Sequence, residues 1–207
     1  MKRAFVVDFD GTVTRDDIGH LIIKTFAEEG WGEWEELWIE RKITTPMCAE
    51  MQWSMVNIAP EDIIDFVKNA DFNQGFKEFY EYVSRIGDRI IIASDGFDFY
   101  INPILKNSGF DNIEVRCCHL EYKDGWKFSY PNLSKKCGQC GNCKKEIVDK
   151  LKEEGYKVYY IGDGYSDRCG CTNADVIFAK SHLARYCEDE KIPHIKFKDF
   201  KEIMAAI

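Results

Sequence analysis

Acidic side chains follow two of the short apolar runs in this chain, at points where a strand would end. Asp8 and Asp10 come one residue apart directly after the run Ala4–Val7, and Asp163 and Asp167 follow a later run of the same kind. A carboxylate at the end of a strand can act as a nucleophile and form an aspartyl phosphate. These four aspartates are therefore the first candidates for chemistry.

Several carboxylates gathered in one place repel one another unless a cation lies among them. Two of them about 4 Å apart repel by roughly 4 kcal/mol at an effective dielectric constant of about 20. Mg²⁺ binds one or two carboxylates together with water and a phosphate oxygen of the substrate. The aspartates therefore predict a Mg²⁺ site, and the Mg²⁺ site predicts a substrate that carries phosphate.

Groups that could hold this phosphate occur at two further places. Ser94 follows the apolar run Ile90–Ala93, and the backbone amides of Asp95 and its neighbour come next. Hydroxyl groups and free backbone amides donate hydrogen bonds to phosphate oxygens. A lysine at the start of the helix after the cysteine-rich segment, either Lys144 or Lys145, supplies positive charge.

Short apolar runs alternate with amphipathic segments along most of the chain, and this pattern must position the polar groups. The runs are rich in Val and Ile, as expected of strands buried on both faces. Their alternation with helical segments predicts an α/β fold with a doubly wound, mostly parallel, Rossmann-like sheet. In such sheets ligands bind beyond the carboxyl ends of the strands, so the polar groups should converge. The runs are Ala4–Val7, Arg89–Ala93, Lys157–Ile161 and Asp175–Ala179.

A stretch of consecutive helical patterns interrupts this alternation. Thr45-Pro46 within it has the pattern of a helix start, an N-cap residue followed by proline at the first helical position. We predict a small inserted helical cap in this stretch and a β-hairpin with a cysteine loop later in the chain. The predicted boundaries are 16–72 for the cap, 1–15 and 73–207 for the core domain, and 113–143 for the hairpin and cysteine loop.

The composition narrows the classes of partner. The 207 residues include 28 Lys and Arg against 36 Asp and Glu, a net charge of −8, whereas nucleic-acid binding needs a basic surface. The longest apolar runs are too short to span a bilayer, and the first residues show no signal-peptide pattern. We therefore expect a cytoplasmic protein without nucleic-acid or membrane partners, and its oligomeric state stays open.

The chain has nine cysteines, an odd and high number. Cys137, Cys140 and Cys143 are spaced two residues apart, and they could complete a tetrahedral structural Zn²⁺ site with ligands from the predicted hairpin, namely Cys117, Cys118 and His119. They could instead include a redox-labile pair, or pack as small buried thiols. The sequence leaves these three interpretations open.

The motifs resemble those of the haloacid dehalogenase superfamily of phosphatases. Asp8-Phe9-Asp10-Gly11-Thr12-Val13-Thr14 is similar to its first motif, DxDGTxT, and Ser94 and Lys144 are similar to its second and third. The segment Gly162–Asp167 is similar to the fourth. The four motifs occur in the order of the family and bracket nearly the whole chain.

This resemblance implies a role for each matching residue. Asp8 would attack phosphorus, and Asp10 would protonate the leaving alcohol and later activate water. Mg²⁺ would be held by Asp8, the backbone carbonyl of Asp10 and Asp163, with Asp167 behind them to orient water or the lysine. The phosphoryl oxygens would be bound by Ser94, Asp95 and Lys144.

Within the superfamily the chain is similar to the phosphoserine phosphatase-like branch. It resembles the group acting on 2-hydroxy-3-keto-5-methylthiopentenyl-1-phosphate and the phosphoethanolamine/phosphocholine phosphatases, because both carry cysteines just before the lysine of the third motif. It departs from phosphoserine phosphatase itself, since Asp17 occupies the position where that enzyme holds the substrate amine with a glutamate. Asp17 is a candidate substrate contact, or an acid that stabilises a helix N-terminus.

These observations predict a Mg²⁺-dependent phosphomonoesterase. It would hydrolyse a small phosphorylated metabolite through an aspartyl-phosphate intermediate. The alternative is a non-catalytic or regulatory phosphate-binding module with a metal site in the cysteine loop.

Overall fold

The computed structural model describes residues 2–207 and contains a seven-stranded sheet in the order β4-β3-β2-β1-β5-β6-β7. Neighbouring strands run parallel, except for the antiparallel β3–β4 hairpin. The α/β fold with a mostly parallel, doubly wound sheet is thus confirmed, and Met1 lies outside the described residues. The strands are β1 (Arg3–Val7), β2 (Arg89–Phe97), β3 (Glu114–Tyr122), β4 (Trp126–Ser129), β5 (Lys157–Gly162), β6 (Val176–Ala179) and β7 (Ile195–Lys196).

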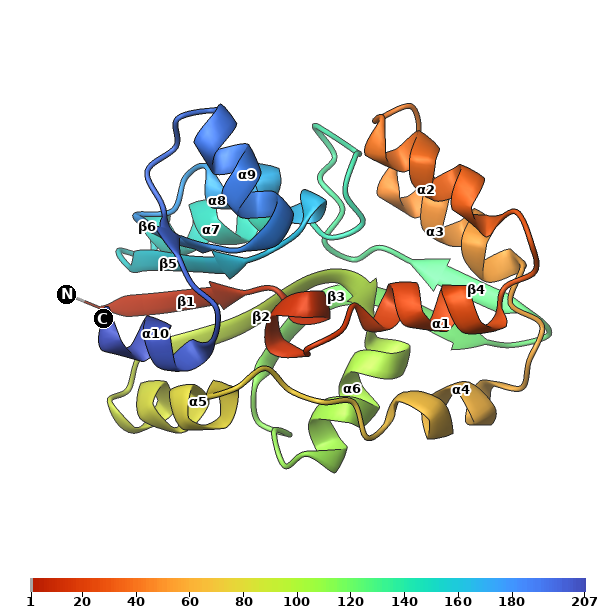
Figure 1. Cartoon of the computed structure of the whole chain (residues 1–207), viewed down its shortest axis with the longest axis horizontal. Coiled ribbons are helices and arrows are strands. Elements are labelled where there is room, and N and C mark those ends of the chain that lie inside the picture. Colours follow the sequence, from red (N-terminus) through yellow and green to blue (C-terminus); the bar gives the residue numbers. More distant parts are fainter. Residues whose placement is uncertain (1) are drawn as a thin grey trace.

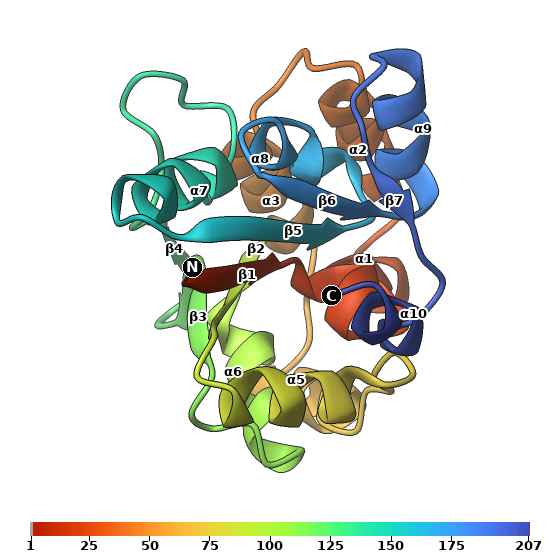
Figure 2. The ribbon, with the colours of Figure 1, turned by 90° about the vertical axis from the view of Figure 1, so that its left-hand side faces the viewer.

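Helices cover both faces of this sheet. Figures 1 and 2 show α7, α8 and α9 on one face and α5, α6 and α10 on the other. Two short helical turns, Phe9–Val13 and Tyr165–Asp167, follow β1 and β5. The helices are α1 (Ile18–Phe26), α2 (Trp31–Ile39), α3 (Thr45–Ser54), α4 (Pro60–Val67), α5 (Phe76–Arg85), α6 (Asp98–Asn107), α7 (Lys144–Glu153), α8 (Arg168–Cys171), α9 (Ser181–Asp189) and α10 (Phe200–Ala205).

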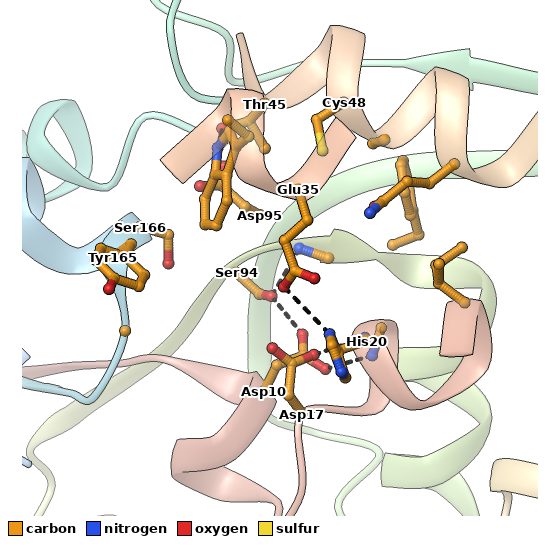
Figure 3. A pocket seen from close by; sticks show the side chains of 18 of the residues that line it. Asp10, Asp17, His20, Glu35, Thr45, Cys48, Ser94, Asp95, Tyr165 and Ser166 are labelled. Atoms are coloured by element: carbon orange, nitrogen blue, oxygen red, sulfur yellow. Dashed lines mark hydrogen bonds and ion pairs between the residues drawn. The ribbon is translucent and has the colours of Figure 1, made fainter. Parts of the chain in front are cut away.

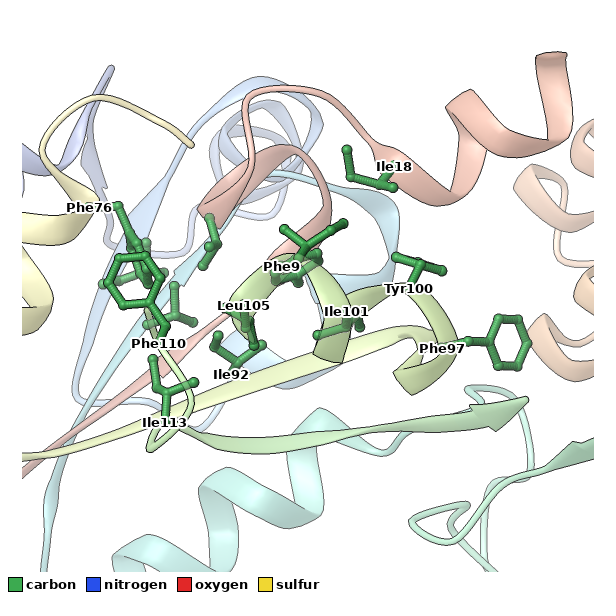
Figure 4. Close-up of a cluster of buried hydrophobic side chains, with 14 of the residues drawn as sticks. Phe9, Ile18, Phe76, Ile92, Phe97, Tyr100, Ile101, Leu105, Phe110 and Ile113 are labelled. Atoms are coloured by element: carbon green, nitrogen blue, oxygen red, sulfur yellow. The ribbon is translucent and has the colours of Figure 1, made fainter. Parts of the chain in front are cut away.

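The strand β1 lies at the centre of the sheet and is buried on both faces. Because side chains alternate along a strand, Phe5 and Val7 join the apolar cluster with α5, α6 and α10, part of which Figure 4 shows. Ala4 and Val6 join a second cluster with α7 and α9. This double burial explains the continuous apolar run in the sequence and fixes the position of the residues that follow it.

The inserted residues form α1 to α4, as the helical patterns suggest. Ile22 of α1, Trp53 of α3 and Ile63 of α4 are buried in the same apolar cluster as α5, α6 and α10. Helices α2 and α3 also pack together beyond the carboxyl end of β1 (Figure 1). The N-cap of α3 is Thr44, whose side chain accepts from the amide of Met47, one residue earlier than predicted. The division into cap and core domains stays a prediction.

Strand β2 is longer than its apolar run. It continues to Phe97, with a register shift against β3 between Ala93 and Phe97. Ser94, Asp95 and Gly96 therefore lie inside an irregular strand end rather than after it. Among the described helices, none has the length and apolar character needed to cross a membrane.

Candidate active site

The turn after β1 brings two carboxylates together. The amide of Asp8 still donates to the carbonyl of Ile161 on β5, at 2.9 Å. The chain then turns sharply at Gly11, whose φ of +73° favours glycine. A Cβ atom at this position would lie 2.8 Å from Oδ2 of Asp163. Glycine therefore allows the first motif to lie directly against the carboxylate that follows β5.

The loop after β5 is held by Asp167. Its Oδ2 accepts from the backbone amides of Asp163 and Gly164 at 3.0 and 2.9 Å, and its Oδ1 accepts from the hydroxyl of Tyr160 at 2.6 Å. The hydroxyl of Thr12 donates to Oδ1 of Asp163 at 2.7 Å. These bonds fix the Asp163 carboxylate beside that of Asp8.

Lys144 and not Lys145 reaches this cluster. The Nζ atom of Lys144 lies 2.6 Å from Oδ1 of Asp8, 2.7 Å from Oδ1 of Asp167 and 3.1 Å from Oγ of Ser166. Burial alone lowers the pKa of Lys144, but the carboxylates of Asp167 and Asp8 raise it well above its usual range. Lys145 instead pairs with Asp149 at the surface. Lys144 is therefore a buried, charged ammonium group.

The carboxyl group of Asp10 faces away from this cluster and is bonded at both oxygens. Its Oδ1 accepts from the amides of Ile18 and Gly19, at 3.0 and 3.2 Å. Its Oδ2 accepts from the hydroxyls of Ser94 and Tyr100, at 3.2 and 2.9 Å. Figure 3 shows Ser94 pointing at Asp10. No sequence pattern pointed to Tyr100, because an aromatic residue in an apolar helix indicates core packing.

Burial makes the Asp10 carboxyl suited to proton transfer. Burial and the nearby charge of Asp17 raise the pKa of Asp10 to about 7, although the hydrogen bonds from Tyr100, Gly19 and Ser94 act in the opposite direction. A general acid or base works best when its pKa lies near the working pH. Asp10 can therefore hold or release a proton close to neutrality.

The three carboxylates of Asp8, Asp163 and Asp167 form a group that could hold a divalent cation. Oxygens of Asp8, Asp163 and Asp167 lie within 4.8 Å of one another, a grouping that recurs nowhere else between residues 2 and 207. Burial and the charge of Asp167 raise the pKa of Asp8 well above its usual range and that of Asp163 to about 6. Because both oxygens of Asp167 already accept hydrogen bonds, Asp8 and Asp163 are the carboxylates that suit a hard cation best.

A cavity of about 410 Å³ extends from these groups toward α2 and α3. Asp17 caps α1 by accepting from the amide of His20 at 2.8 Å, and it also lines this cavity. Glu35 of α2 lies on the opposite wall with its Oε1 3.3 Å from Nδ1 of His20, as Figure 3 shows. Trp38 and Trp53 form apolar walls. Within the described chain, no lysine or arginine lines the cavity.

The loop before Lys144 is tied to the end of β2 through Asp95. The carboxylate oxygen Oδ1 of Asp95 accepts from the amide of Asn142 at 2.7 Å, and the side chain of Asn142 donates to the carbonyl of Arg116. Oδ2 of Asp95 is buried without a partner among residues 2–207. Burial raises the pKa of Asp95 to about 6, although Lys144 lowers it. The side chain of Asp95 thus holds the loop before Lys144 against the end of β2.

The thiols of the cysteine loop do not form a cluster that could hold a metal ion in the described structure. All nine cysteines are free, and Cys137, Cys140 and Cys143 do not form a group with sulfur atoms within 4.8 Å in the described structure. Cys118 of the hairpin donates instead to the carbonyl of Asp95. The arrangement supplies no donor set for Zn²⁺, so the zinc interpretation stays a prediction without support here.

Comparison with known proteins identifies the family to which the chain belongs. The sequence profile of the haloacid dehalogenase-like hydrolases matches residues 5–170, which span the carboxylates, Ser94, Lys144 and Asp163. The chain is a haloacid dehalogenase-like hydrolase. The match confirms the superfamily that the four motifs suggest. It also confirms that the protein is an enzyme.

Relatives of the hydrolase match along nearly its whole length. A Brevibacillus brevis protein named 2-hydroxy-3-keto-5-methylthiopentenyl-1-phosphate phosphatase is 30% identical over 208 residues, which cover 98% of this chain and 94% of the relative. A Geobacillus thermodenitrificans protein of the same name is 29% identical over 212 residues, covering 99% and 96%.

Solved structures match the fold of the hydrolase as a whole. A phosphoserine phosphatase described as a phospho-aspartyl intermediate analogue aligns with a TM-score of 0.74 and 22% identity, covering 100% of this chain and 99% of that one. A substrate-bound phosphoserine phosphatase aligns with a TM-score of 0.73 and 21% identity, with the same coverage. At this level of identity the likeness shows the shared fold.

Proposed function

We propose that the hydrolase is a Mg²⁺-dependent phosphomonoesterase that cleaves a small phosphorylated metabolite through an aspartyl phosphate on Asp8. The observation that carries this proposal is the buried ammonium group of Lys144 beside the carboxylates of Asp8 and Asp167, with Asp8 also lining the pocket. A buried lysine among carboxylates suits a site where further negative charge must be held during phosphoryl transfer. No observation favours the non-catalytic alternative.

The first half of the reaction forms the aspartyl phosphate. A carboxylate oxygen of Asp8 attacks phosphorus, and the bond from phosphorus to the alcohol oxygen breaks with its electron pair on that oxygen. Asp10 gives its proton to the departing alcohol, which leaves Asp10 ionised. The hydroxyl of Ser94, the amide of Asp95 and the ammonium group of Lys144 hold the phosphoryl oxygens.

The second half releases phosphate. Ionised Asp10 accepts a proton from a water molecule as that water attacks phosphorus. The bond between phosphorus and Asp8 then breaks, and the electron pair returns to the Asp8 carboxylate. Both aspartates are restored to their starting protonation states, and inorganic phosphate leaves the pocket.

Mg²⁺ would be held by the carboxylates of Asp8 and Asp163 and by the backbone carbonyl of Asp10. It would supply positive charge against the phosphoryl oxygens and among the carboxylates. Asp167 stays behind this set, because Lys144, Tyr160 and two backbone amides already use its oxygens.

Metal removal tests this proposal. Hydrolysis of p-nitrophenyl phosphate should fall by at least about 100-fold when Mg²⁺ is removed with EDTA, and it should return when Mg²⁺ is added in excess. The measurement is the initial rate of p-nitrophenol release, with Ca²⁺ addition as a control for simple charge neutralisation. Undiminished hydrolysis in EDTA would contradict the metal requirement.

The cavity also supports a substrate class. Its walls offer Asp17 and Glu35 beyond the reacting groups and no lysine or arginine among the residues described. A second anionic group on the substrate would therefore meet these carboxylates and no lysine or arginine in the lining that could bind it. We propose that the alcohol part of the substrate is neutral or carries an amine. The relatives named for 2-hydroxy-3-keto-5-methylthiopentenyl-1-phosphate agree with an uncharged alcohol part.

Glu35→Gln tests this charge preference. The enzyme should cleave propyl phosphate faster than the phosphate ester of 3-hydroxypropionate, its analogue with a terminal carboxylate, because Glu35 repels the second anion. The substitution should narrow the ratio of the two kcat/KM values by about five- to tenfold, as expected for a screened charge pair. Glu36→Gln, an exposed change on the same helix, is the matched control. An unchanged ratio in Glu35→Gln would argue against this role.

A further inference from the structure

The hydroxyl of Tyr100 makes a buried contact with the proposed proton donor. Tyr100 lies in the first turn of α6 with 1% of its surface exposed, and its ring belongs to the apolar cluster in Figure 4. Its hydroxyl lies 2.9 Å from Oδ2 of Asp10, its one side-chain partner within residues 2–207. A buried phenol hydroxyl needs a hydrogen-bond partner, and Tyr100, which also lines the pocket, has this partner in Asp10.

The surrounding backbone is built to leave room for this contact. A Cβ atom at Gly96 would collide with the Tyr100 hydroxyl and would lie 2.7 Å from Oδ2 of Asp10. A Cβ atom at Gly19 would lie 3.0 Å from the same hydroxyl. Two glycines from different elements, the end of β2 and the start of α1, thus flank the hydrogen bond. Because neither Gly19 nor Gly96 has a side chain, there is space for the hydrogen bond between Tyr100 and Asp10.

The hydrogen bond from Tyr100 also helps to fix the orientation of the Asp10 carboxyl group. One oxygen is held by the amides of Ile18 and Gly19, and the other by Ser94 and Tyr100. In the proposed reaction the Ser94 hydroxyl instead donates to a phosphoryl oxygen of the substrate. Tyr100 then remains as the side chain, among those described, that holds the second oxygen of Asp10.

We propose that Tyr100 is a positioning residue that orients Asp10 for proton transfer to the leaving alcohol. This inference rests on the proposed phosphatase function and deepens it. During the transfer, the O–H bond of Asp10 breaks, an O–H bond to the alcohol oxygen forms, and negative charge develops on the Asp10 carboxyl. The Tyr100 hydroxyl donates to that carboxyl as its charge appears, and the phenol itself keeps its proton.

Tyr100→Phe tests this role through the leaving group. An alkoxide needs a proton in order to leave, whereas p-nitrophenolate leaves readily without one. We expect kcat/KM for propyl phosphate to fall by about 30-fold, a part of the roughly 10²- to 10⁴-fold that general acid catalysis supplies, and kcat/KM for p-nitrophenyl phosphate to fall by less than about threefold. The ratio kcat/KM is used because it reports on the steps up to alcohol release.

A second variant separates positioning from packing. Tyr159→Phe removes the hydroxyl of another tyrosine whose ring packs in the same apolar cluster, from β5 and outside the pocket lining, and should leave both rates unchanged. Equal losses for the two esters in Tyr100→Phe, or no loss for either, would overturn the inference. Failure of the unaltered enzyme to cleave either ester would instead overturn the proposed function, so the two failures are distinguishable.

Discussion

Replacing Asp8 with asparagine should abolish phosphomonoester hydrolysis while leaving the fold intact. The amide has nearly the same shape and can still accept from Lys144, but it is a poor nucleophile and cannot form the acyl phosphate. We expect kcat for p-nitrophenyl phosphate to fall by about 10⁴-fold or more, as when other enzymes lose their nucleophile. Initial rates with saturating substrate and Mg²⁺ measure this effect.

The control for Asp8→Asn is a similar change outside the pocket. Asp111→Asn at an exposed position should keep the full rate. Because Asp8→Asn removes one charge from a cluster of carboxylates, its thermal unfolding temperature should not fall below that of the unaltered enzyme. A rate for Asp8→Asn within tenfold of normal would mean that another group attacks phosphorus.

Replacing Lys144 with methionine should damage both stability and catalysis. The ammonium group is buried with the carboxylates of Asp8 and Asp167, and removing one partner of a buried ion pair leaves uncompensated charge. We expect the free energy of unfolding in urea, without metal, to fall by about 3 kcal/mol or more. Loss of a charged contact to the phosphoryl group should lower kcat/KM by at least about 100-fold.

Lys145→Met is the matched control for Lys144→Met. It removes the same group from the next residue, where the lysine is 42% exposed and pairs with Asp149 at the surface. Such exposed pairs contribute little, so its free energy of unfolding should stay within about 0.5 kcal/mol of normal. If both variants behaved alike, the buried position of Lys144 would not matter to the enzyme in solution.

The sequence predicts this site where chemistry and topology act locally. Asp8 and Asp163 each follow an apolar run, and adjacent parallel strands bring their ends to one edge of the sheet. Their encounter follows from the pairing of β1 with β5; the alternating pattern predicts a parallel sheet but does not say which strands are adjacent. The choice between Lys144 and Lys145 needed the helix itself, because the two side chains point about 100° apart around its axis.

Other features depend on tertiary contacts that no local pattern carries. Tyr100 has the composition of a core residue, and only the packing of α6 against the first motif places its hydroxyl near Asp10. The strand β2 continues past its apolar run because Phe97 pairs with Cys118 of β3 after a register shift that begins at Ala93. Spacing alone also suggested a metal site for the cysteine loop, whereas the position of each thiol depends on how that loop packs.

The proposed mechanism requires a covalent bond between phosphorus and Asp8 during turnover, and chemical trapping can detect this bond. A reaction quenched with acid in the steady state and then reduced with borohydride converts an aspartyl phosphate into homoserine. Peptide mass spectrometry should find homoserine at position 8 with substrate and Mg²⁺, and aspartate there without substrate. Homoserine at another position, or none at position 8 while substrate is being hydrolysed rapidly, would contradict the account.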